Sequence, residues 1–394
     1  MGYHLSCGGK IVNKAGTIVY VGGFEMPDKN AAAHRVLNNA KIFSQIGYHT
    51  VFCGIDKQIE NNCEKAIKID NFDSFPAKYP KNNIEWFKNL MGFKHIKSVI
   101  ERYPDTAFVV AYNLHAIPLN RLIRYCKKKN IKVIADITEW YEYKFSIHPI
   151  KFIKWYDTKT VMTKLHKKTD GIIAISAFLK EYYSPFVKKI IQLPPLVDIS
   201  QEIWQQEPKN TNDKIEFVYS GVPGRGEEKD KIGLLVEAFS NLSVDNDFLF
   251  TIIGITKKQF ELDFPEYKSS VAKMGEKIQF CGRVSHFDSV QALKRADYCI
   301  FIRNRNQRNV MAGFPTKFVE CITSGIGIIA NRISNIDDYA SFGNCTFLEK
   351  EDMSYIEQTI KEKLQKNKKI THLVADVFDY KRYFDVMKQF LNAI

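Results

Sequence analysis

The sequence lacks the features that mark exported, membrane-spanning or zinc-binding proteins. Its 394 residues include eight cysteines, yet these form no CxxC pair and no zinc-finger spacing. The longest apolar runs, such as FLFTIIGI from Phe248, are too short to cross a bilayer. The first ten residues have no charged start followed by an apolar stretch, so no signal peptide is evident. We therefore expect a protein of the reducing cytoplasm.

Signatures of nucleic-acid recognition are also missing. The chain has no RRM motif, no finger spacing and no compact basic recognition helix. Its net charge of +13 nevertheless indicates an anionic partner, such as a lipid surface or a phosphorylated small molecule. Our leading expectation is therefore that the protein has no nucleic-acid partner. A basic nucleic-acid-binding protein is the less favoured alternative hypothesis.

The composition is that of a globular protein with two cores. Apolar residues make up 45% of the chain and aromatic residues 13%, and no low-complexity tract or short internal repeat is present. A chain of 394 residues suits two domains of ordinary size better than one.

The two halves follow the same order of elements. GTIVYVGGF predicts a buried strand that ends in a glycine pair, and a helical stripe and the strand HTVFCGI follow it. In the second half, KIEFVYSGVPGRGEEKDKIGLLVEAFSNL likewise predicts a strand, a glycine-rich loop and a helix. We predict an α/β protein with two doubly wound Rossmann-like domains that face each other across a cleft. The expected boundaries are 1–198, 199–375 and a C-terminal helix in 376–394 that could pack back on the first domain.

Ligands of open parallel sheets bind beyond the C-terminal ends of the strands. The stretch AGFPTKFVECITSGIGIIAN has Pro315 at the expected first helical position. Thr316 and Lys317 would then offer free N–H groups and a charge at the positive end of a helix, where phosphate binds. Glu320, one turn further, could accept hydrogen bonds from ribose hydroxyls. The alternative is an exposed Lys317–Glu320 pair that only stabilises the helix.

The loop SGVPGRGEEKD is a second candidate phosphate site. Gly221 lets backbone approach a ligand closely, and Arg225 and Lys229 could face a diphosphate. The loop has neither the GK[ST] ending of a Walker motif nor the pattern GxGxxG. The alternative is an ordinary solvated loop.

Candidate residues in the first half also follow strands. Gly22 and Gly23 would let the donor approach at the cleft, while Asp136 and Glu139, just past a strand end, could bind an acceptor hydroxyl. Both carboxylates could equally cap the next helix. His115 is a further acceptor-side candidate, or a structural histidine.

These stretches resemble a known family. SGVPGRGEEKDKIGLLVEAF, GRVSHFDSVQALKRADYCIFIR and AGFPTKFVECITSGIGIIAN, in this order and spacing, resemble the donor-binding domain of GT-B glycosyltransferases. The likeness is strongest to the retaining family 4 enzymes of bacterial polysaccharide and capsule synthesis, and it covers nearly the whole chain, loosely before residue 170.

The resemblance implies a role for individual residues. Lys229 matches the basic residue that neutralises the donor diphosphate, with Arg225 as a helper and Arg303 as a further cation. Glu320 matches the second glutamate of the family's E-x7-E element, which holds the ribose. Ala312 stands where the first glutamate would be, which leaves the donor sugar open.

Catalysis in such enzymes depends on the leaving group. Cations and amides stabilise the charge that develops on the departing diphosphate. No DxD-type element stands out, so we expect no metal and no cofactor besides the nucleoside-diphosphate sugar substrate.

Residues 140–168 are rich in lysine and aromatic side chains. The segment holds seven lysines against two acids, interleaved with seven aromatics. Such side chains suit the edge of an anionic membrane, so we predict peripheral attachment to the inner face of the cell membrane. The alternative is a solvated helix with a buried aromatic face.

The leading hypothesis is a glycosyltransferase that moves a sugar from a nucleoside diphosphate to a glycan or lipid-linked acceptor in cell-surface polysaccharide synthesis. A catalytically impaired binding or scaffolding protein of the same fold is the main alternative, because the glutamate at Ala312 is missing.

Overall fold

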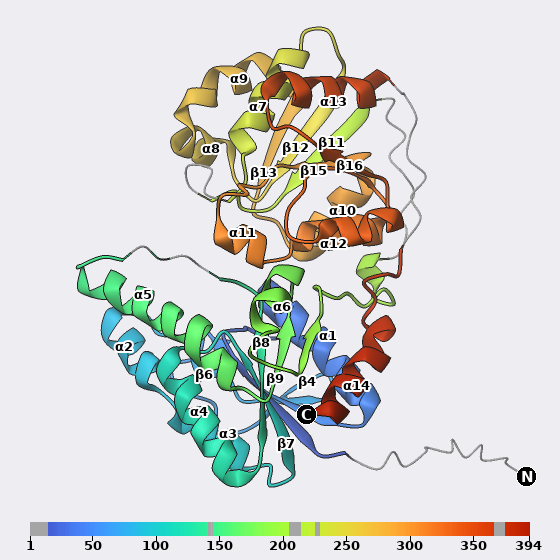
Figure 1. The fold of residues 1–394 in the computed structure, drawn as a ribbon. Coiled ribbons are helices and arrows are strands. Elements are labelled where there is room, and N and C mark those ends of the chain that lie inside the picture. The colour runs from blue at the N-terminus through green and yellow to red at the C-terminus, as the bar shows by residue number, and fades with distance from the viewer. Residues whose placement is uncertain (1–14, 141–142, 144, 205–213, 225–228, 366–374) are drawn as a thin grey trace, which may run out of the picture.

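The chain folds into two α/β domains stacked one above the other (Figure 1). The computed structural model describes residues 15–140, 143, 145–204, 214–224, 229–365 and 375–394. This arrangement confirms the prediction of two doubly wound, Rossmann-like domains.

The first domain contains an eight-stranded sheet in the order β10-β9-β8-β7-β1-β2-β5-β4. All of its strand pairs are parallel except β4 with β5. Its strands are β1 (Thr17–Gly22), β2 (His49–Cys53), β4 (Ile67–Ile69), β5 (Phe72–Ser74), β7 (Thr106–Tyr112), β8 (Lys132–Ile137), β9 (Gly171–Ala174) and β10 (Ile190–Gln192). A separate parallel pair joins β3 (Ile55–Asp56) to β6 (Ala77–Lys78). The strand order reverses between β1 and β7, which defines a topological switch point at their C-terminal ends.

Helices flank this sheet. They are α1 (Ala31–Ile46), α2 (Asn83–Met91), α3 (Lys94–Glu101), α4 (Ala116–Lys129), α5 (Pro149–Thr160) and α6 (Ala177–Tyr183). The predicted cap of α1 is confirmed, since the Asn30 side chain accepts a hydrogen bond from the Ala33 N–H at 2.8 Å. Gly47, at φ 112°, ends the helix in a left-handed conformation and leads into β2.

The second domain has a six-stranded, all-parallel sheet in the order β13-β12-β11-β14-β15-β16. Its strands are β11 (Ile215–Ser220), β12 (Phe248–Ile253), β13 (Ile278–Gly282), β14 (Tyr298–Phe301), β15 (Gly327–Asn331) and β16 (Cys345–Leu348). Its helices are α7 (Ile232–Leu242), α8 (Lys257–Asp263), α9 (Lys268–Met274), α10 (His286–Arg295), α11 (Arg308–Ala312), α12 (Thr316–Ser324) and α13 (Met353–Gln365). The switch point of this sheet lies between β11 and β14.

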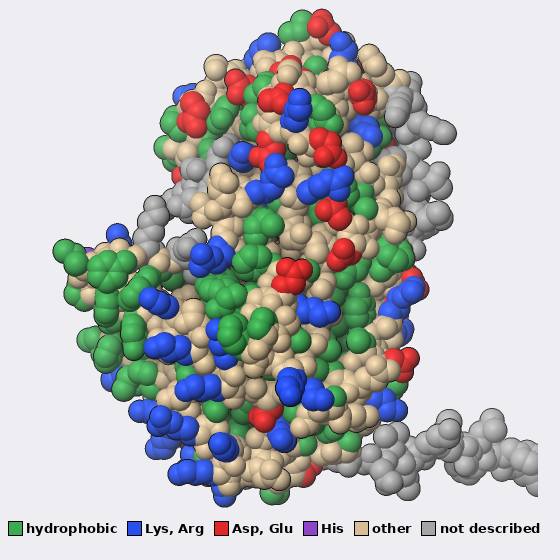
Figure 2. All heavy atoms as spheres, viewed as in Figure 1, with side chains coloured by type: hydrophobic (Ala, Val, Ile, Leu, Met, Phe, Trp, Pro, Cys, Tyr) green, Lys and Arg blue, Asp and Glu red, His purple; other side chains and the backbone are tan. Residues whose placement is uncertain are grey.

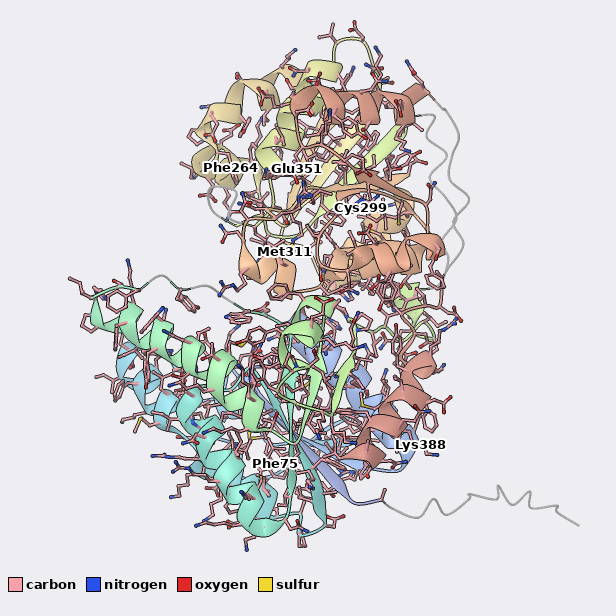
Figure 3. All side chains as sticks on the ribbon, in the orientation of Figure 1. Phe75, Phe264, Cys299, Met311, Glu351 and Lys388 are labelled. Atoms are coloured by element: carbon pink, nitrogen blue, oxygen red, sulfur yellow. The ribbon has the colours of Figure 1, made fainter. Side chains whose placement is uncertain are left out.

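Buried hydrophobic side chains fill both domains, and one cluster of them continues from the first domain into the second. Figure 3 marks Phe75 in the first domain and Phe264 and Cys299 in the second, and all three side chains are buried. The last helix, α14 (Phe384–Ala393), lies against α1 and β10 of the first domain. A side chain at Gly171 would lie within 2.9 Å of Phe390, so this glycine lets the helix pack closely on the sheet.

Candidate functional site

The loops after β11 and β14 meet at the switch point of the second domain. Asp230 and Arg303 form an antiparallel backbone bridge there. On either side of it, the Lys231 N–H donates to Ile302 O at 2.7 Å and the Asn304 N–H donates to Lys229 O at 3.0 Å. These hydrogen bonds fix residues 229–231 beside the end of β14.

Asp230 is the centre of a buried ionic cluster. It is 1% exposed and accepts hydrogen bonds from Lys317 Nζ at 2.8 Å, Arg303 Nε at 3.1 Å and the Tyr219 hydroxyl at 2.6 Å. Burial alone would raise the pKa of Asp230, but the neighbouring cations hold it below its usual value. Asp230 is therefore a carboxylate that anchors two of the predicted phosphate-binding cations, and sequence reasoning missed it.

Lys317 is buried by the same contacts. Its ammonium lies 4.1 Å from the centre of the Tyr219 ring, a cation–π distance. A side chain at Gly221, which has φ +140°, would come within 3.2 Å of Lys317 Nζ. Gly221 thus brings the end of β11 close to this ammonium group.

Lys229 differs from the other two cations because its side chain reaches solvent. Partial loss of hydration lowers the pKa of Lys229, and the charges of Lys317 and Arg303 lower it further. Asp230 and Glu139 act in the opposite direction. Since Glu139 belongs to the first domain, the predicted acceptor-side carboxylate lies near enough to the predicted donor-side lysine to influence its protonation.

Helix α12 begins one residue later than predicted. Pro315 is the N-cap residue, with φ −74° and ψ 113°, and Thr316 is the first helical residue. Pro315 therefore precedes the helix, because its extended ψ turns the chain into the first turn. The exposed Lys317–Glu320 pair does not form, since Lys317 pairs with Asp230 and Glu320 pairs with His286 Nε2 at 3.2 Å.

A cleft of about 370 Å³ separates the two domains beside this helix. From the second domain, Gly221, Thr316 and Glu320 line it, and from the first domain α1 contributes His34. The rings of His34 and His286 meet at 4.5 Å across the cleft. Burial lowers the pKa of His34, and His286 lowers it further. Neither histidine was predicted, because the two imidazoles become neighbours only through the packing of the domains.

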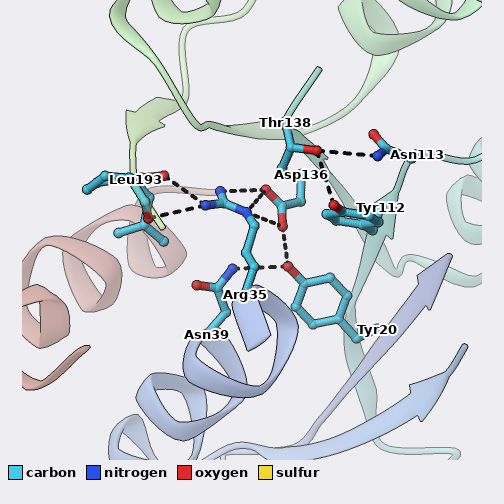
Figure 4. A network of polar contacts seen from close by, with 9 residues as sticks. Tyr20, Arg35, Asn39, Tyr112, Asn113, Asp136, Thr138 and Leu193 are labelled. Atoms are coloured by element: carbon cyan, nitrogen blue, oxygen red, sulfur yellow. Dashed lines mark hydrogen bonds and ion pairs between the residues drawn. The ribbon is translucent and has the colours of Figure 1, made fainter. Parts of the chain in front are cut away.

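The first domain has its own ionic cluster at the end of β8 (Figure 4). Asp136 is 1% exposed, and its carboxylate pairs with Arg35 Nη2 at 2.7 Å and accepts the Tyr20 hydroxyl. Arg35 also donates to the carbonyls of Leu193 and Pro194. The prediction that Asp136 could bind an acceptor hydroxyl is therefore wrong, because buried partners from α1 and β1 occupy its oxygens.

A second cavity of about 590 Å³ lies at the switch point of the first domain. Gly22, Gly23 and His115 line it, so the two glycines predicted to approach the donor lie here rather than in the cleft that contains Glu320. A side chain at Gly22 would meet the Tyr112 carbonyl oxygen at 1.9 Å, whereas one at Gly23 would meet nothing within 4 Å.

His115 has a structural contact at the edge of this second cavity. Its Nδ1 lies 2.8 Å from Asp157 Oδ2, and the other oxygen of Asp157 accepts the Ala116 N–H at 2.7 Å. Asp157 therefore caps α4 and ties α5 to it. His115 still lines the second cavity, so a ligand there would lie beside this pair.

Two further predictions concern the loops of the second domain. Arg225 lies outside the described residues. Ala312 is fully buried, and its carbonyl accepts the Ser176 hydroxyl of the first domain at 2.6 Å. Within the described ranges, no group of three or more His, Cys, Asp or Glu side chains could hold a metal ion.

The second domain matches a known family. Residues 200–387 match the family described as Glycosyl transferases group 1. Among curated proteins no sequence match is found. The matched region covers the predicted second domain from residue 200 onward and the first four residues of α14.

Solved structures share the fold of the whole chain. A structure described as trehalose-6-phosphate from E. coli bound with UDP-2-fluoro glucose is similar at 9% identity, with a TM-score of 0.64 and coverage of 96% of this chain and 99% of the other. HepE from Anabaena, in complex with UDP and glucose, has 10% identity, a TM-score of 0.60 and coverage of 96% and 100%. The apo lipopolysaccharide outer core galactosyltransferase WaaB has 14% identity, a TM-score of 0.57 and coverage of 96% and 99%. The chain therefore has the GT-B fold that was predicted.

Proposed function

We propose that this GT-B chain, with its glycosyltransferase group 1 domain, transfers a sugar from a nucleoside-diphosphate sugar to a glycan or lipid-linked saccharide. The observation that carries the proposal is the cationic cluster of Lys229, Lys317 and Arg303 at the switch point of the second domain. Ligands of such sheets bind at this position, and the start of α12 lies beside it.

The leaving diphosphate would be stabilised by this end of the second domain. Lys229 would neutralise the charge that develops as the glycosidic bond breaks, with the first amides of α12 near Thr316 as further donors. Glu320 lines the neighbouring cleft and would accept the ribose hydroxyls in place of His286. Two similar structures contain UDP or a UDP-sugar, so a uracil nucleotide is the first donor to test.

The acceptor would bind in the first domain. The second cavity opens at the ends of β1, β2 and β7, and the charge of Glu139, from the same domain, raises the pKa of Lys229. The carboxylate of Glu139 is the candidate to receive a hydrogen bond from the acceptor hydroxyl. Retention of the anomeric configuration and a role in cell-surface polysaccharide synthesis are the finer parts of this proposal, supported by the likeness of the sequence motifs to family 4.

A thermal shift panel tests the donor proposal. UDP, GDP, ADP and CMP are each added to the full chain, and we expect one of them to raise the melting temperature. Mass spectrometry of membrane extract incubated with the corresponding sugar nucleotides should then reveal the product, and parallel reactions with a chelator test whether transfer is independent of metal. Stabilisation by none of the four nucleotides would contradict the proposal.

A binding protein without catalysis remains the second candidate, and Ala312 favours it. The methyl group of Ala312 provides no carboxylate at the position where the resemblance places the first glutamate of E-x7-E. Such a protein would be stabilised by a nucleotide yet form no product with any donor of the panel, which distinguishes it from the enzyme.

We further propose that the first domain docks on an anionic membrane through α5 and α2. In α5 no residue is buried, and Phe145, Ile147, Phe152 and Tyr156 are exposed along it or just before it. On α2, Ile84 and Phe87 are exposed as well. Lys154 Nζ lies 5.9 Å from the Trp86 ring, so the two helices are neighbours.

Figure 2 shows hydrophobic side chains gathered at the projecting end of α5, with Lys and Arg side chains over the adjacent surface. Exposed aromatic rings next to lysines match the interfacial region of an anionic bilayer. None of the described helices is long and apolar enough to cross a membrane. Part of the predicted segment 140–168, namely 141–142 and 144, lies outside the described residues.

A liposome pelleting assay tests this docking. Replacing Lys151, Lys154, Lys164 and Lys167 with Glu should abolish pelleting with vesicles that contain anionic lipid. The matched control replaces Lys257, Lys258, Lys268 and Lys273, which are exposed on α8 and α9 of the other domain, and should pellet like the wild type. Equal pelleting of both variants would contradict the membrane proposal.

A further inference from the structure

The donor site that we propose contains a carboxylate that no motif identifies. Asp230 contacts two of the predicted phosphate-binding cations, Lys317 and Arg303, and the third cation, Lys229, precedes it in the chain. A buried carboxylate next to a diphosphate site would repel the ligand unless neighbouring cations neutralised its charge. Its contacts show that they do.

The geometry divides the three cations into two classes. Lys317 and Arg303 are each 7% exposed, and Asp230 engages both through direct hydrogen bonds. Lys229 reaches solvent, and no hydrogen bond from its ammonium to Asp230 is among those that fix the cluster. Two cations are therefore held in place, while the third can move toward a ligand.

The charge of the cluster is also set by Asp230. Three cations and one carboxylate give these four side chains a net charge of +2. A diphosphate ester carries a negative charge on each phosphate, so the cluster can balance the bound donor. Without the carboxylate, three cations would lie together with no compensating charge among them, two of them buried, which is electrostatically costly.

We propose that Asp230 is a positioning residue of the donor site, which holds Lys317 and Arg303 in place and leaves Lys229 as the cation that meets the diphosphate. This inference rests on the proposed function. The Tyr219 hydroxyl, which donates to Asp230 at 2.6 Å, fixes the orientation of the carboxylate from β11.

The proposal predicts a change in pH dependence. The charged groups that face Lys229 are Lys317 from α12 and Arg303 after β14, which lower its pKa, and Asp230 and Glu139, which raise it. Asp230→Asn removes one of the two raising charges, so the Lys229 ammonium should lose its proton at lower pH. Nucleotide affinity would then decline earlier as the pH rises, by about one pH unit or more.

The test is isothermal titration between pH 6 and pH 10 with the nucleoside diphosphate that stabilises the wild type best among UDP, GDP and ADP. In Asp230→Asn we expect the alkaline midpoint of binding to move down by about one unit. The double variant Asp230→Asn/Lys317→Met removes one charge of each sign, so its midpoint should return to that of the wild type even though its affinity is lower. This variant also replaces a buried ion pair by neutral groups and keeps the test valid if the single variant does not fold.

Asp297→Asn is the matched control. Asp297 is also a buried carboxylate of the second domain, but it accepts the Glu216 N–H at the opposite end of the sheet, before β14. Its loss should reduce stability without moving the midpoint. Failure of the wild type to bind any of the three nucleotides would contradict the proposed function itself. Binding by the wild type, with the same midpoint in Asp230→Asn or a shifted midpoint in the double variant, would overturn the role of Asp230.

Discussion

The switch points of the two domains contain the same arrangement of side chains with different net charges. In the first domain, Tyr20 of β1 donates to Asp136, which pairs with Arg35. In the second, Tyr219 of β11 donates to Asp230, which pairs with Arg303. Each tyrosine lies on the strand at the centre of its sheet, two residues before the glycine that ends or follows that strand.

The difference is one more cation in the second domain. Arg35 and Asp136 neutralise each other, and Arg35 uses its remaining donors on the carbonyls of the segment that leads out of the first domain. Asp230 has Lys317 as a second partner, and Lys229 lies nearby. The Arg35–Asp136 pair has no net charge with which to attract an anion. The cluster around Asp230 has a net positive charge and can attract one. The same arrangement therefore has a structural role in one domain and a proposed binding role in the other.

The largest effect that we expect from breaking this symmetry is on stability. Arg35→Met leaves the buried Asp136 without its cation, which should cost about 3–5 kcal/mol in the free energy of unfolding. Arg303→Met should cost clearly less, because Lys317 still neutralises Asp230 at 2.8 Å. Denaturant unfolding of both variants measures the difference. Equal losses of unfolding free energy in the two variants would show that Lys317 does not neutralise Asp230 when Arg303 is absent.

The next effect is on turnover. Lys229→Ala and Glu320→Ala should each abolish detectable transfer and leave the fold intact, because Lys229 is exposed and Glu320 lines the cleft rather than a core. Removing one electrostatic contact to a developing anion typically lowers kcat about 100-fold to 1,000-fold.

Product formation by mass spectrometry and a thermal melt measure these two outcomes. Lys273→Ala is the control, because this exposed lysine of α9 precedes the N-terminal end of β13, at the opposite end of the sheet, and it should turn over like the wild type. Wild-type rates in both site variants would remove Lys229 and Glu320 from the proposed mechanism.

Local sequence patterns predicted the fold because the features that determine it are local. The apolar strand GTIVYVG, the Asn30 cap and the glycine that ends α12 each involve residues a few positions apart. Repetition of the same pattern in each half then indicated two parallel sheets. The first residue of α12 was missed by one position, since the preference of Pro315 for a first helical turn also suits an N-cap with extended ψ.

The site was predicted only in part, because its ionic partners are far apart in sequence. Lys317 and Asp230 are 87 residues apart, and Arg35 and Asp136 are 101 residues apart. From the sequence alone, Asp136 and Glu139 looked like equivalent carboxylates after a strand. Only the packing of α1 shows that Asp136 is buried with a partner, while the charge of Glu139 acts on Lys229 of the other domain.

A smaller effect on stability should distinguish Gly221, which follows Tyr219, from Gly23, which follows Tyr20. A side chain at Gly221 would lie 3.2 Å from Lys317 Nζ and adopt φ +140°, a conformation that costs other residues about 1–3 kcal/mol. Gly221→Ala should therefore lose stability and weaken nucleotide binding. Gly23→Ala, whose new side chain would meet nothing within 4 Å, should change stability by less than about 0.5 kcal/mol.

Thermal melts and nucleotide titrations of the two glycine variants provide the measurement. If Gly23→Ala weakened nucleotide binding and Gly221→Ala did not, the donor would approach the first domain, as the sequence had suggested for Gly22 and Gly23.

The two domains should also differ in how their folding stability responds to acid. Burial lowers the pKa of His166 in the first domain to about 3, and its Nδ1 lies 3.1 Å from the Tyr183 hydroxyl. The unfolded chain binds this proton near pH 6.5, so between about pH 6.5 and pH 3 the unfolded state carries more protons than the folded one. Stability therefore falls as the pH decreases, by about 1.4 kcal/mol per pH unit for this histidine.

Burial also lowers the pKa of His34 and His95, which lie in the same domain and should steepen the decline. Three of the four tryptophans, Trp86, Trp140 and Trp155, lie in the first domain, so tryptophan fluorescence follows mainly that domain. His166→Gln removes one titrating group, so its stability should depend less steeply on pH even if its absolute stability is lower. An unchanged slope would mean that His166 takes up its proton in the folded state as readily as in the unfolded one, so that any acid sensitivity of the first domain would have to come from its other buried histidines.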